Sequence, residues 1–261
     1  AVLEGPLGRR QILNHLKEGA QPVVSCRDVA KFEIPCPSLM EQRAIAAALA
    51  ETDALIASLV RLISKKQHIV CGVTRRLVSG MLRLPGFTGE WRTRRLGELA
   101  CFRPGTYLAQ VSYRDGPFEV QGAGARMGWH DAPTVREPIS VIGRVGTVGK
   151  PRFFEQGCWV NNNAASLSAI RGMAHPAFVH LLLESIEWVN VSAVTAQPFL
   201  NVGDLLALRF TVPPVDEQQA IADIVRDAEA EIATLNARLH KTLALKHGVT
   251  QELLAGRTRL V

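Results

Sequence analysis

The sequence predicts an α+β protein, in which a globular mixed α/β domain is joined to two long helices that form an antiparallel coiled coil. Three observations lead to this prediction: the chain carries an internal duplication, each copy holds a long heptad pattern, and the segment between the copies has short apolar runs separated by glycines. The chain has 261 residues, of which 47% are hydrophobic and 21% are charged, as is usual for a globular protein with a real core.

The duplication becomes visible when the sequence is shifted by 176 residues against itself. Residues 19–84 then align with 195–260 without a gap, and 22 of the 66 aligned positions are identical. Glu41 aligns with Glu217, and the motif Glu-Gln-x-Ala-Ile-Ala begins at both residues. A period of this length does not belong to a solenoid, and it indicates a duplicated module with a separate domain between its copies.

Each copy predicts one long helix, because its apolar residues recur at alternating spacings of four and three. Pro37 and Pro214 precede the helices and Gly80 and Gly256 follow them, which leaves roughly 40 residues, or about 60 Å, for each. Two ordinary amphipathic core helices are the alternative, but five matched heptads favour a coiled coil. The predicted seam consists of Ile45, Leu49, Ile56, Leu59, Ile63, Val73, Leu77, Ile221, Val225, Ile232, Leu235, Leu239, Val249 and Leu253.

Polar residues interrupt both seams, at Lys66 in the first copy and at Thr242 and Lys246 in the second. Such residues weaken a seam but can set its register; alternatively they face solvent near a frayed end. The first helix ends near residue 80 and the second begins near 216, so an antiparallel pair places both junctions with the intervening domain at one end. We therefore expect antiparallel pairing.

The segment between the helices predicts the mixed domain. Its candidate strands are Phe118–Gln121, Ile139–Gly143, Gly157–Asn161, Ala165–Ile170 and Leu205–Val212, and its candidate helix is Pro176–Asn190. The first 33 residues resemble the end of this domain, since GAQPVVSCRDVAKFEIP parallels TAQPFLNVGDLLALRFTVP. The expected organisation is the end of one such domain at 1–36, a helix at 37–84, a complete domain at 85–212 and a second helix at 213–261.

Composition narrows the function classes. The formal charge of +6 permits nucleic-acid binding without requiring it. The five cysteines are scattered and odd in number, so we expect reduced thiols in a cytoplasmic protein. No apolar run reaches the length of about 18 residues that a membrane span needs, and no cysteine lies in a CxxC pair of the kind that binds zinc. We therefore expect neither a metal nor a cofactor.

No catalytic motif is recognisable. The stretch from Gly143 to Pro151 comes closest to a phosphate-binding loop, but Arg144 stands where the first glycine belongs and Pro151 where the hydroxyl belongs. Asp216-Glu217-Gln218 is better explained as a helix start than as a helicase motif, and no Gly-x-Ser-x-Gly sequence occurs. The sequence predicts a protein that is not an enzyme.

Several motifs together resemble the DNA-specificity subunit of type I restriction-modification systems. They are Pro-(x3)-Glu-Gln-x-Ala-Ile-Ala, Gly-Val-Thr, the run from Arg83 to Trp91, the loop from Arg144 to Gly149, and Ala-Gln-Pro before the last strand. The likeness covers residues 20–261. It implies target-recognition domains that read double-stranded DNA, a helical spacer, and complexes with methyltransferase and restriction/translocase subunits. This chain departs from that pattern by holding one complete recognition domain and only the end of another.

The candidate DNA contacts are basic and amide side chains in loops, because phosphates favour Arg and Lys while base edges favour Arg, Asn and Gln. A plain β-turn is the alternative for the loop from Arg144 to Lys150, a structural amide for Gln197, and turn chemistry for Asn162. The predicted contacts are Arg126, His130, Arg144, Thr147, Lys150, Asn162 and Gln197.

Two functional hypotheses follow. The first is a recognition subunit that directs methyltransferase and restriction subunits to a DNA target, either as a homodimer that reads a symmetric site or by completing another chain. The second is a degenerate scaffold that binds methyltransferase subunits without reading DNA.

Overall fold

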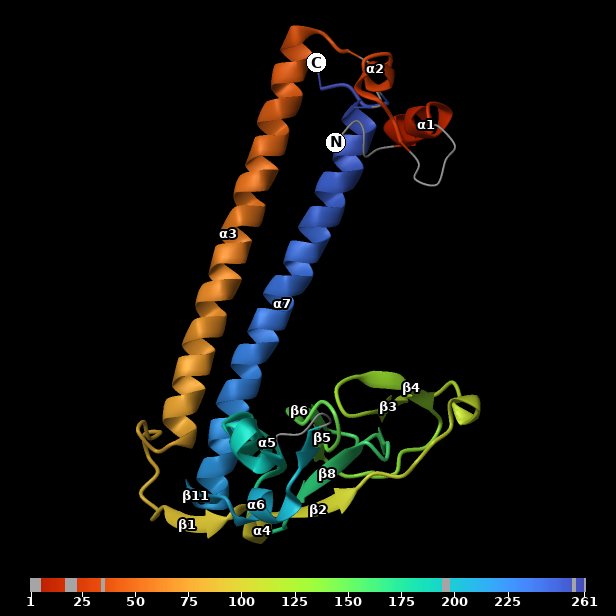
Figure 1. Cartoon of the computed structure of the whole chain (residues 1–261). Coiled ribbons are helices and arrows are strands. Elements are labelled where there is room, and N and C mark those ends of the chain that lie inside the picture. Colours follow the sequence, from red (N-terminus) through yellow and green to blue (C-terminus); the bar gives the residue numbers. More distant parts are fainter. Residues whose placement is uncertain (1–5, 17–22, 34–35, 194–197, 255–256, 261) are drawn as a thin grey trace. The chain divides into compact units, whose positions relative to one another are not determined.

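The computed structural model describes residues 6–16, 23–33, 36–193, 198–254 and 257–260 (Figure 1). The chain forms two compact units, of which one comprises Ala1–His68 with Ala230–Val261 and the other comprises Ile69–Glu229. Both long helices continue from one unit into the other.

The first unit contains the short helices α1 (Pro6–Asn14) and α2 (Cys26–Val29) and most of the 40-residue helices α3 (Leu39–Val78) and α7 (Val215–Leu254). The helix α2 begins with a capping box, in which the Ser25 hydroxyl accepts the backbone N–H of Asp28. The same unit pairs α3 with α7 (Figure 1).

Ion pairs show the direction of this pairing. Residues further along α7 meet residues earlier in α3, in the pairs Lys66–Glu231 at 2.7 Å and Asp53–Lys246. Arg259, which follows α7, pairs in the same direction with Glu41 near the start of α3, at 2.8 Å. The helices are therefore antiparallel, which confirms the predicted fold class. Lys66 and Lys246 reach across the seam to acidic residues instead of being buried in it.

The heptad positions of α3 carry most of its buried surface in this unit. Ile45, Leu59 and Ile63 are each at most 6% exposed. In α7, Ile232, Leu235 and Leu239 are half-buried and Leu253 is buried, but Val249 is 48% exposed, so this predicted seam residue lies largely outside the helix contact.

The second unit is built on two small sheets. A four-stranded antiparallel sheet has the order β2-β8-β5-β6, and a three-stranded sheet has the order β4-β3-β7. Their strands are β2 (Ala100–Pro104), β8 (Ala164–Ala169), β5 (Ile139–Gly143), β6 (Gly149–Phe154), β4 (Arg126–His130), β3 (Phe118–Gln121) and β7 (Trp159–Val160).

Two further strand pairs complete the unit. The strand β1 (Arg92–Arg95) pairs with β11 (Arg209–Val212), and β9 (Ser192–Ala193) pairs with β10 (Phe199–Leu200). The helix α4 (Leu96–Leu99) lies against α6 (Val202–Ala207), and single 3-10 turns cover Gln110–Ser112 and Trp188–Val191.

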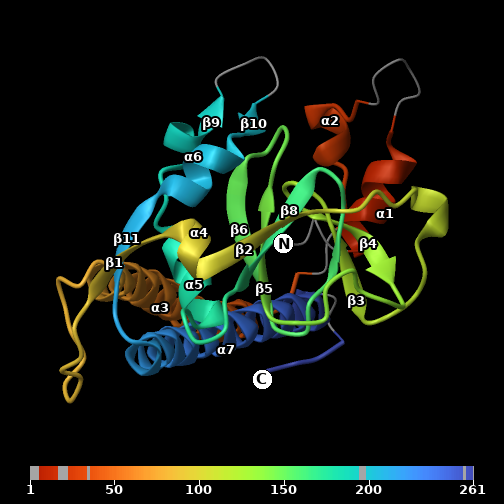
Figure 2. The same cartoon turned by 90° about the horizontal axis from the view of Figure 1, so that it is seen from below.

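The main core of this unit lies between the larger sheet and the helices. The helix α5 (Pro176–Glu184) packs on β5 and β6 (Figure 2). Its residue Phe178 is completely buried. Leu77 at the end of α3 and Ile221 near the start of α7 belong to the same core. The second unit thus includes the adjoining turns of both helices in its core.

Two of the expected elements differ from the structure. The apolar run Leu205–Val212 is not one strand, because the Asn201 side chain accepts the N–H groups of Gly203 and Asp204 and starts the helix α6 before β11 begins. The expected helix Pro176–Asn190 ends at Glu184 and is followed by a 3-10 turn.

The five cysteines are free thiols, of which only Cys158 is buried. No helix in the described part of the chain is both long and apolar enough to cross a membrane.

Candidate nucleic-acid interface

The turn between β5 and β6 has an unusual backbone, which its glycines make possible. Gly146 and Gly149 have φ angles of 76° and 81°, in the left-handed region that side chains disfavour. Lys150 follows with φ 50°, which is rare for a residue other than glycine. The N–H of Gly146 donates to the carbonyl of Pro198 at 2.8 Å, so the turn is tied to the neighbouring segment.

Three loops meet at this turn. The backbone N–H of Arg144 donates to the Asn163 carbonyl at 2.9 Å, and the Arg144 guanidinium donates to the Asn162 carbonyl at 3.4 Å. The third loop, the turn at 122–125, approaches the end of β5 so closely that a Cβ on Gly143 would lie 2.4 Å from the Ala123 carbonyl oxygen. The turns at 122–125 and 144–148 and the loop at 161–163 therefore form one continuous edge, which we call the loop edge.

The loop edge brings together three of the predicted contacts, Arg144, Thr147 and Asn162, and a fourth, Lys150, lies next to it at the start of β6. Arg144 is half-buried, whereas Thr147, Lys150 and Asn162 are exposed. The Thr147 side chain lies against Gly124, since a Cβ there would be 3.1 Å from it. These cationic, hydroxyl and amide groups on a closely packed backbone are able to bind phosphates and base edges.

Arg126 begins β4, next to the loop edge. Its guanidinium lies 4.7 Å from the centre of the Trp129 ring and 3.9 Å from the Glu119 carboxylate. Half of the side chain remains exposed, so the arginine is held from two sides and is still accessible.

His130, also a predicted contact, lies at the end of β4. Its side chain is buried, its Nδ1 accepts the backbone N–H of Ala132 at 3.0 Å, and its ring lies 4.5 Å from that of Trp159. Packing against Trp159 and the hydrogen bond at Nδ1 hold the ring in place. Gln197 lies outside the described residues.

Sequence reasoning missed Arg152, which joins the two sheets. Its guanidinium lies 3.1 Å from Glu119, hydrogen-bonds to the Gln121 side chain, and lies over the Phe154 ring at 5.1 Å. Glu119 therefore faces two arginines, Arg126 and Arg152. No sequence signal marks this cluster, because its members come from three strands.

A second polar cluster anchors the start of α7. Glu217 is fully buried and accepts hydrogen bonds from Arg83 at 2.9 and 3.1 Å and from the Trp91 indole at 3.3 Å. Gln218 accepts the His175 N–H at 2.9 Å and donates to the Pro213 carbonyl at 2.9 Å. The predicted explanation of this motif as a helix start agrees with these contacts.

Among the described residues, no group of three or more His, Cys, Asp or Glu side chains could hold a metal ion.

Comparisons with known proteins agree with this description. The model of the family described as type I restriction modification DNA specificity domain matches residues 88–244, which is more than half of the chain. No curated protein sequence matches the chain.

Two solved structures share the fold. The type I restriction-modification system S subunit from M. genitalium superposes with a TM-score of 0.68 at 19% identity, over 95% of this chain and 70% of that one. A chain from a structural study of complex assembly and conformational transition of the type I R-M system gives a TM-score of 0.62 at 20% identity, over 95% of this chain and 66% of that one.

Proposed function

The chain belongs to the family of type I restriction-modification DNA specificity domains, and from this premise we propose that it is the DNA-recognition subunit of such a complex. In this role it reads double-stranded DNA and directs methyltransferase and restriction/translocase subunits to the target. The single observation that carries the proposal is the family match over residues 88–244, which contain the whole loop edge. The scaffold hypothesis has no observation in its favour.

The proposed subunit acts in the cytoplasm by binding and not by catalysis, and it uses no cofactor. The contacts that support this function are Arg126, Arg144, Thr147, Lys150 and Asn162, because all five lie in or beside the loop edge and Arg126, Thr147, Lys150 and Asn162 are exposed. Arg144 supplies a half-buried cation at the centre of this edge.

Footprinting with the methyltransferase subunit tests the proposal. We expect protection of one DNA sequence that persists at salt concentrations at which non-specific binding is lost. Binding that is indifferent to sequence and disappears with rising salt would instead support the scaffold. Sequencing of methylated genomic DNA from cells that carry both subunits would give the target and its symmetry.

We also propose that a second recognition domain, supplied by another copy of the chain, completes the reader. The duplication supports this. Val73 and Leu84 pack against the core of the second unit, but their equivalents in the other copy, Val249 and Leu260, are 48% and 44% exposed. The surface that the recognition domain covers in the first copy is thus exposed to solvent in the second copy.

Light scattering at micromolar concentration tests the homodimer. We expect twice the mass of the 28.5 kDa chain. A monomer at these concentrations would contradict self-association, and would leave DNA recognition to be judged by the footprint.

A further inference from the structure

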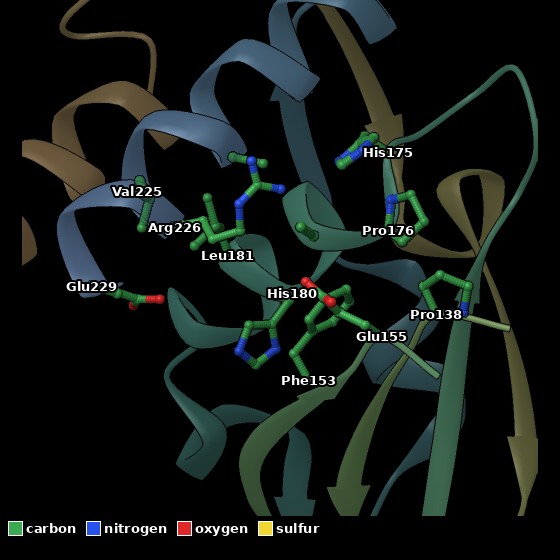
Figure 3. Close-up of a pocket in the computed structure, with 12 residues that line it drawn as sticks. Pro138, Phe153, Glu155, His175, Pro176, His180, Leu181, Val225, Arg226 and Glu229 are labelled. Carbon is green, nitrogen blue, oxygen red and sulfur yellow. The ribbon is translucent and has the colours of Figure 1, made fainter. Parts of the chain in front are cut away.

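A cavity of about 390 Å³ lies in the second unit, where α5 and β6 face the first turns of α7 (Figure 3). Phe153, Leu181 and Val225 supply apolar surface to its wall. The His180 ring lies 5.5 Å from the Phe153 ring, and its Nδ1 is 3.3 Å from the Ser140 hydroxyl. None of the residues that line this cavity belongs to the loop edge.

Negative charge around the cavity is not balanced. Glu155 and Glu229 line it, and in the described part of the chain no lysine or arginine pairs with either. Arg226 also lines it, but its guanidinium is 2.8 Å from Asp223, which already compensates its charge. A third carboxylate, that of Glu184, lies 3.6 Å from the His180 Nε2.

The histidines do not supply the missing positive charge. Burial lowers the pKa of His180 to about 4 and also lowers the pKa of His175, so both rings are neutral near pH 7. The Nδ1 atom of His175 is buried and has no hydrogen-bond partner in the described structure. Burial raises the pKa of Glu184 and of Glu229, and the charge of Glu229 raises that of Glu184 further.

The charge of the cavity disfavours DNA as its occupant. Its residue Phe153 lies near the end of β6, four residues or about 13 Å from Gly149 at the loop edge. A polyanion would be repelled by Glu155, Glu184 and Glu229. A cation, in contrast, would be attracted to the three carboxylates and would relieve the repulsion between Glu184 and Glu229.

We propose that the cavity is a docking site for a lysine or arginine side chain presented by a protein partner. The aliphatic part of such a side chain packs on Phe153, Leu181 and Val225, and its charged end lies between the carboxylates of Glu155 and Glu229. The inference rests on the proposed function in one respect, because that function makes the methyltransferase subunit the partner.

Charge reversal tests the site. The methyltransferase subunit is titrated against the full-length wild-type chain and against the variants Glu155→Arg, Glu229→Arg and Glu51→Arg. The last is a matched control, with the same change on an exposed position of α3. We expect each cavity variant to weaken methyltransferase binding at least tenfold, while the control and the binding of each variant to DNA stay within twofold of the wild type.

Each outcome is decisive. If the cavity variants bind the methyltransferase as well as the wild type does, the docking site is overturned and the proposed function stands. If the wild type itself does not bind the methyltransferase, the docking inference and the proposed complex fail together. Should an arginine variant unfold, the double variant Glu155→Gln/Glu229→Gln, which only removes charge, must show the same weakening.

Discussion

Glu217 and Glu41 hold the same position in the two copies and make the same kind of ion pair, since Arg83 and Arg259 are also equivalent. Their surroundings differ. Glu217 accepts an additional hydrogen bond from Trp91, and its partner Arg83 is 36% exposed, whereas Arg259 is 64% exposed. The pKa of Arg83 is raised, mainly because its guanidinium donates a hydrogen bond to Glu217. Identical residues are therefore expected to contribute unequally to stability.

This difference predicts unequal effects of truncation. Glu217→Ala leaves an indole N–H and a guanidinium without their buried acceptor and should lower the free energy of unfolding by about 2–4 kcal/mol. Glu41→Ala, the matched control, should cost less because its partner is more exposed. Urea unfolding of both variants provides the measurement, and equal losses would contradict the prediction.

The buried histidine of the docking cavity makes stability depend on pH. Its pKa is about 4 in the folded protein and near 6.5 in an unfolded chain, so between these values the unfolded chain binds more protons. The free energy of unfolding should thus fall by about 2–3 kcal/mol from this group as the pH is lowered from 6.5 to 4.

The variant His180→Gln isolates that contribution. The raised pKa values of Glu184 and Glu229 make the protein more stable as the pH falls, and they do so in both the wild type and the variant. Urea unfolding at several pH values should show a shallower loss of stability on acidification for the variant. Parallel pH profiles would exclude His180 as the cause.

Beside the loop edge, Lys150 gives a prediction about DNA. Lys150→Ala should weaken binding to all sequences similarly and reduce the slope of log affinity against log salt by about 1, as expected for one lost phosphate contact. Fluorescence anisotropy at several salt concentrations measures the slope. Lys65→Ala, an exposed change on α3, should leave the slope as it is.

Individual side chains were only partly predictable from the sequence. Arg144, Lys150 and Asn162 were singled out because glycines and amides mark turns, and turns are a local property. The burial of His130 cannot be predicted from local sequence, because it depends on Trp159, which is 29 residues away in the chain. Arg152 was missed for the same reason, since its partners Glu119 and Gln121 lie in another sheet.

At the scale of elements, heptads identified both long helices because the helix period repeats many times within each copy. The short strands gave weaker signals. Phe118–Gln121 and Ile139–Gly143 agree with β3 and β5, whereas β6, interrupted by a proline and charged residues, was not expected. The helix α6 was hidden because its apolar residues continue without a break into β11.

The β5–β6 turn allows a matched test of its two glycines. Gly146→Ala should lower the free energy of unfolding by about 1 kcal/mol. The left-handed backbone is the sole cause of this loss, because a Cβ at this position meets nothing within 4 Å. Gly149→Ala should cost about 1–3 kcal/mol more, since its Cβ would lie 2.4 Å from the Trp188 ring. Thermal unfolding compares the two variants. Similar losses of stability would show that the Trp188 side chain moves away from the new Cβ at no cost.

At the scale of the whole molecule, the duplication relates the contacts of one copy to those of the other. Gln218 hydrogen-bonds to the Pro213 carbonyl, and the equivalent Gln42 does the same to Pro37. These contacts and the ion pairs of Glu41 and Glu217 explain why Glu and Gln recur at both helix starts and why an arginine recurs beyond both helix ends. The sequence alone does not show how much of each copy's surface is buried, because that burial depends on which domain packs against the copy.

The antiparallel register predicts how the helices tolerate length changes. Seven residues inserted into α3 after Ile56 keep the heptad phase but displace Lys66 from Glu231 or Asp53 from Lys246, and should lower the melting temperature. A second insertion of seven residues after Thr242 in α7 should restore most of it, because the seams match again. Melting curves that show no recovery in the double insertion would contradict this register.

The ion pairs between the helices have a consequence for how the length of this protein can change in evolution. An insertion or deletion in one copy of the duplicated module leaves every contact beyond it out of step with the other copy. Lineages that lengthen or shorten this protein are therefore expected to alter both copies together and in whole heptads, so that two separated parts of one gene vary in size as a single trait.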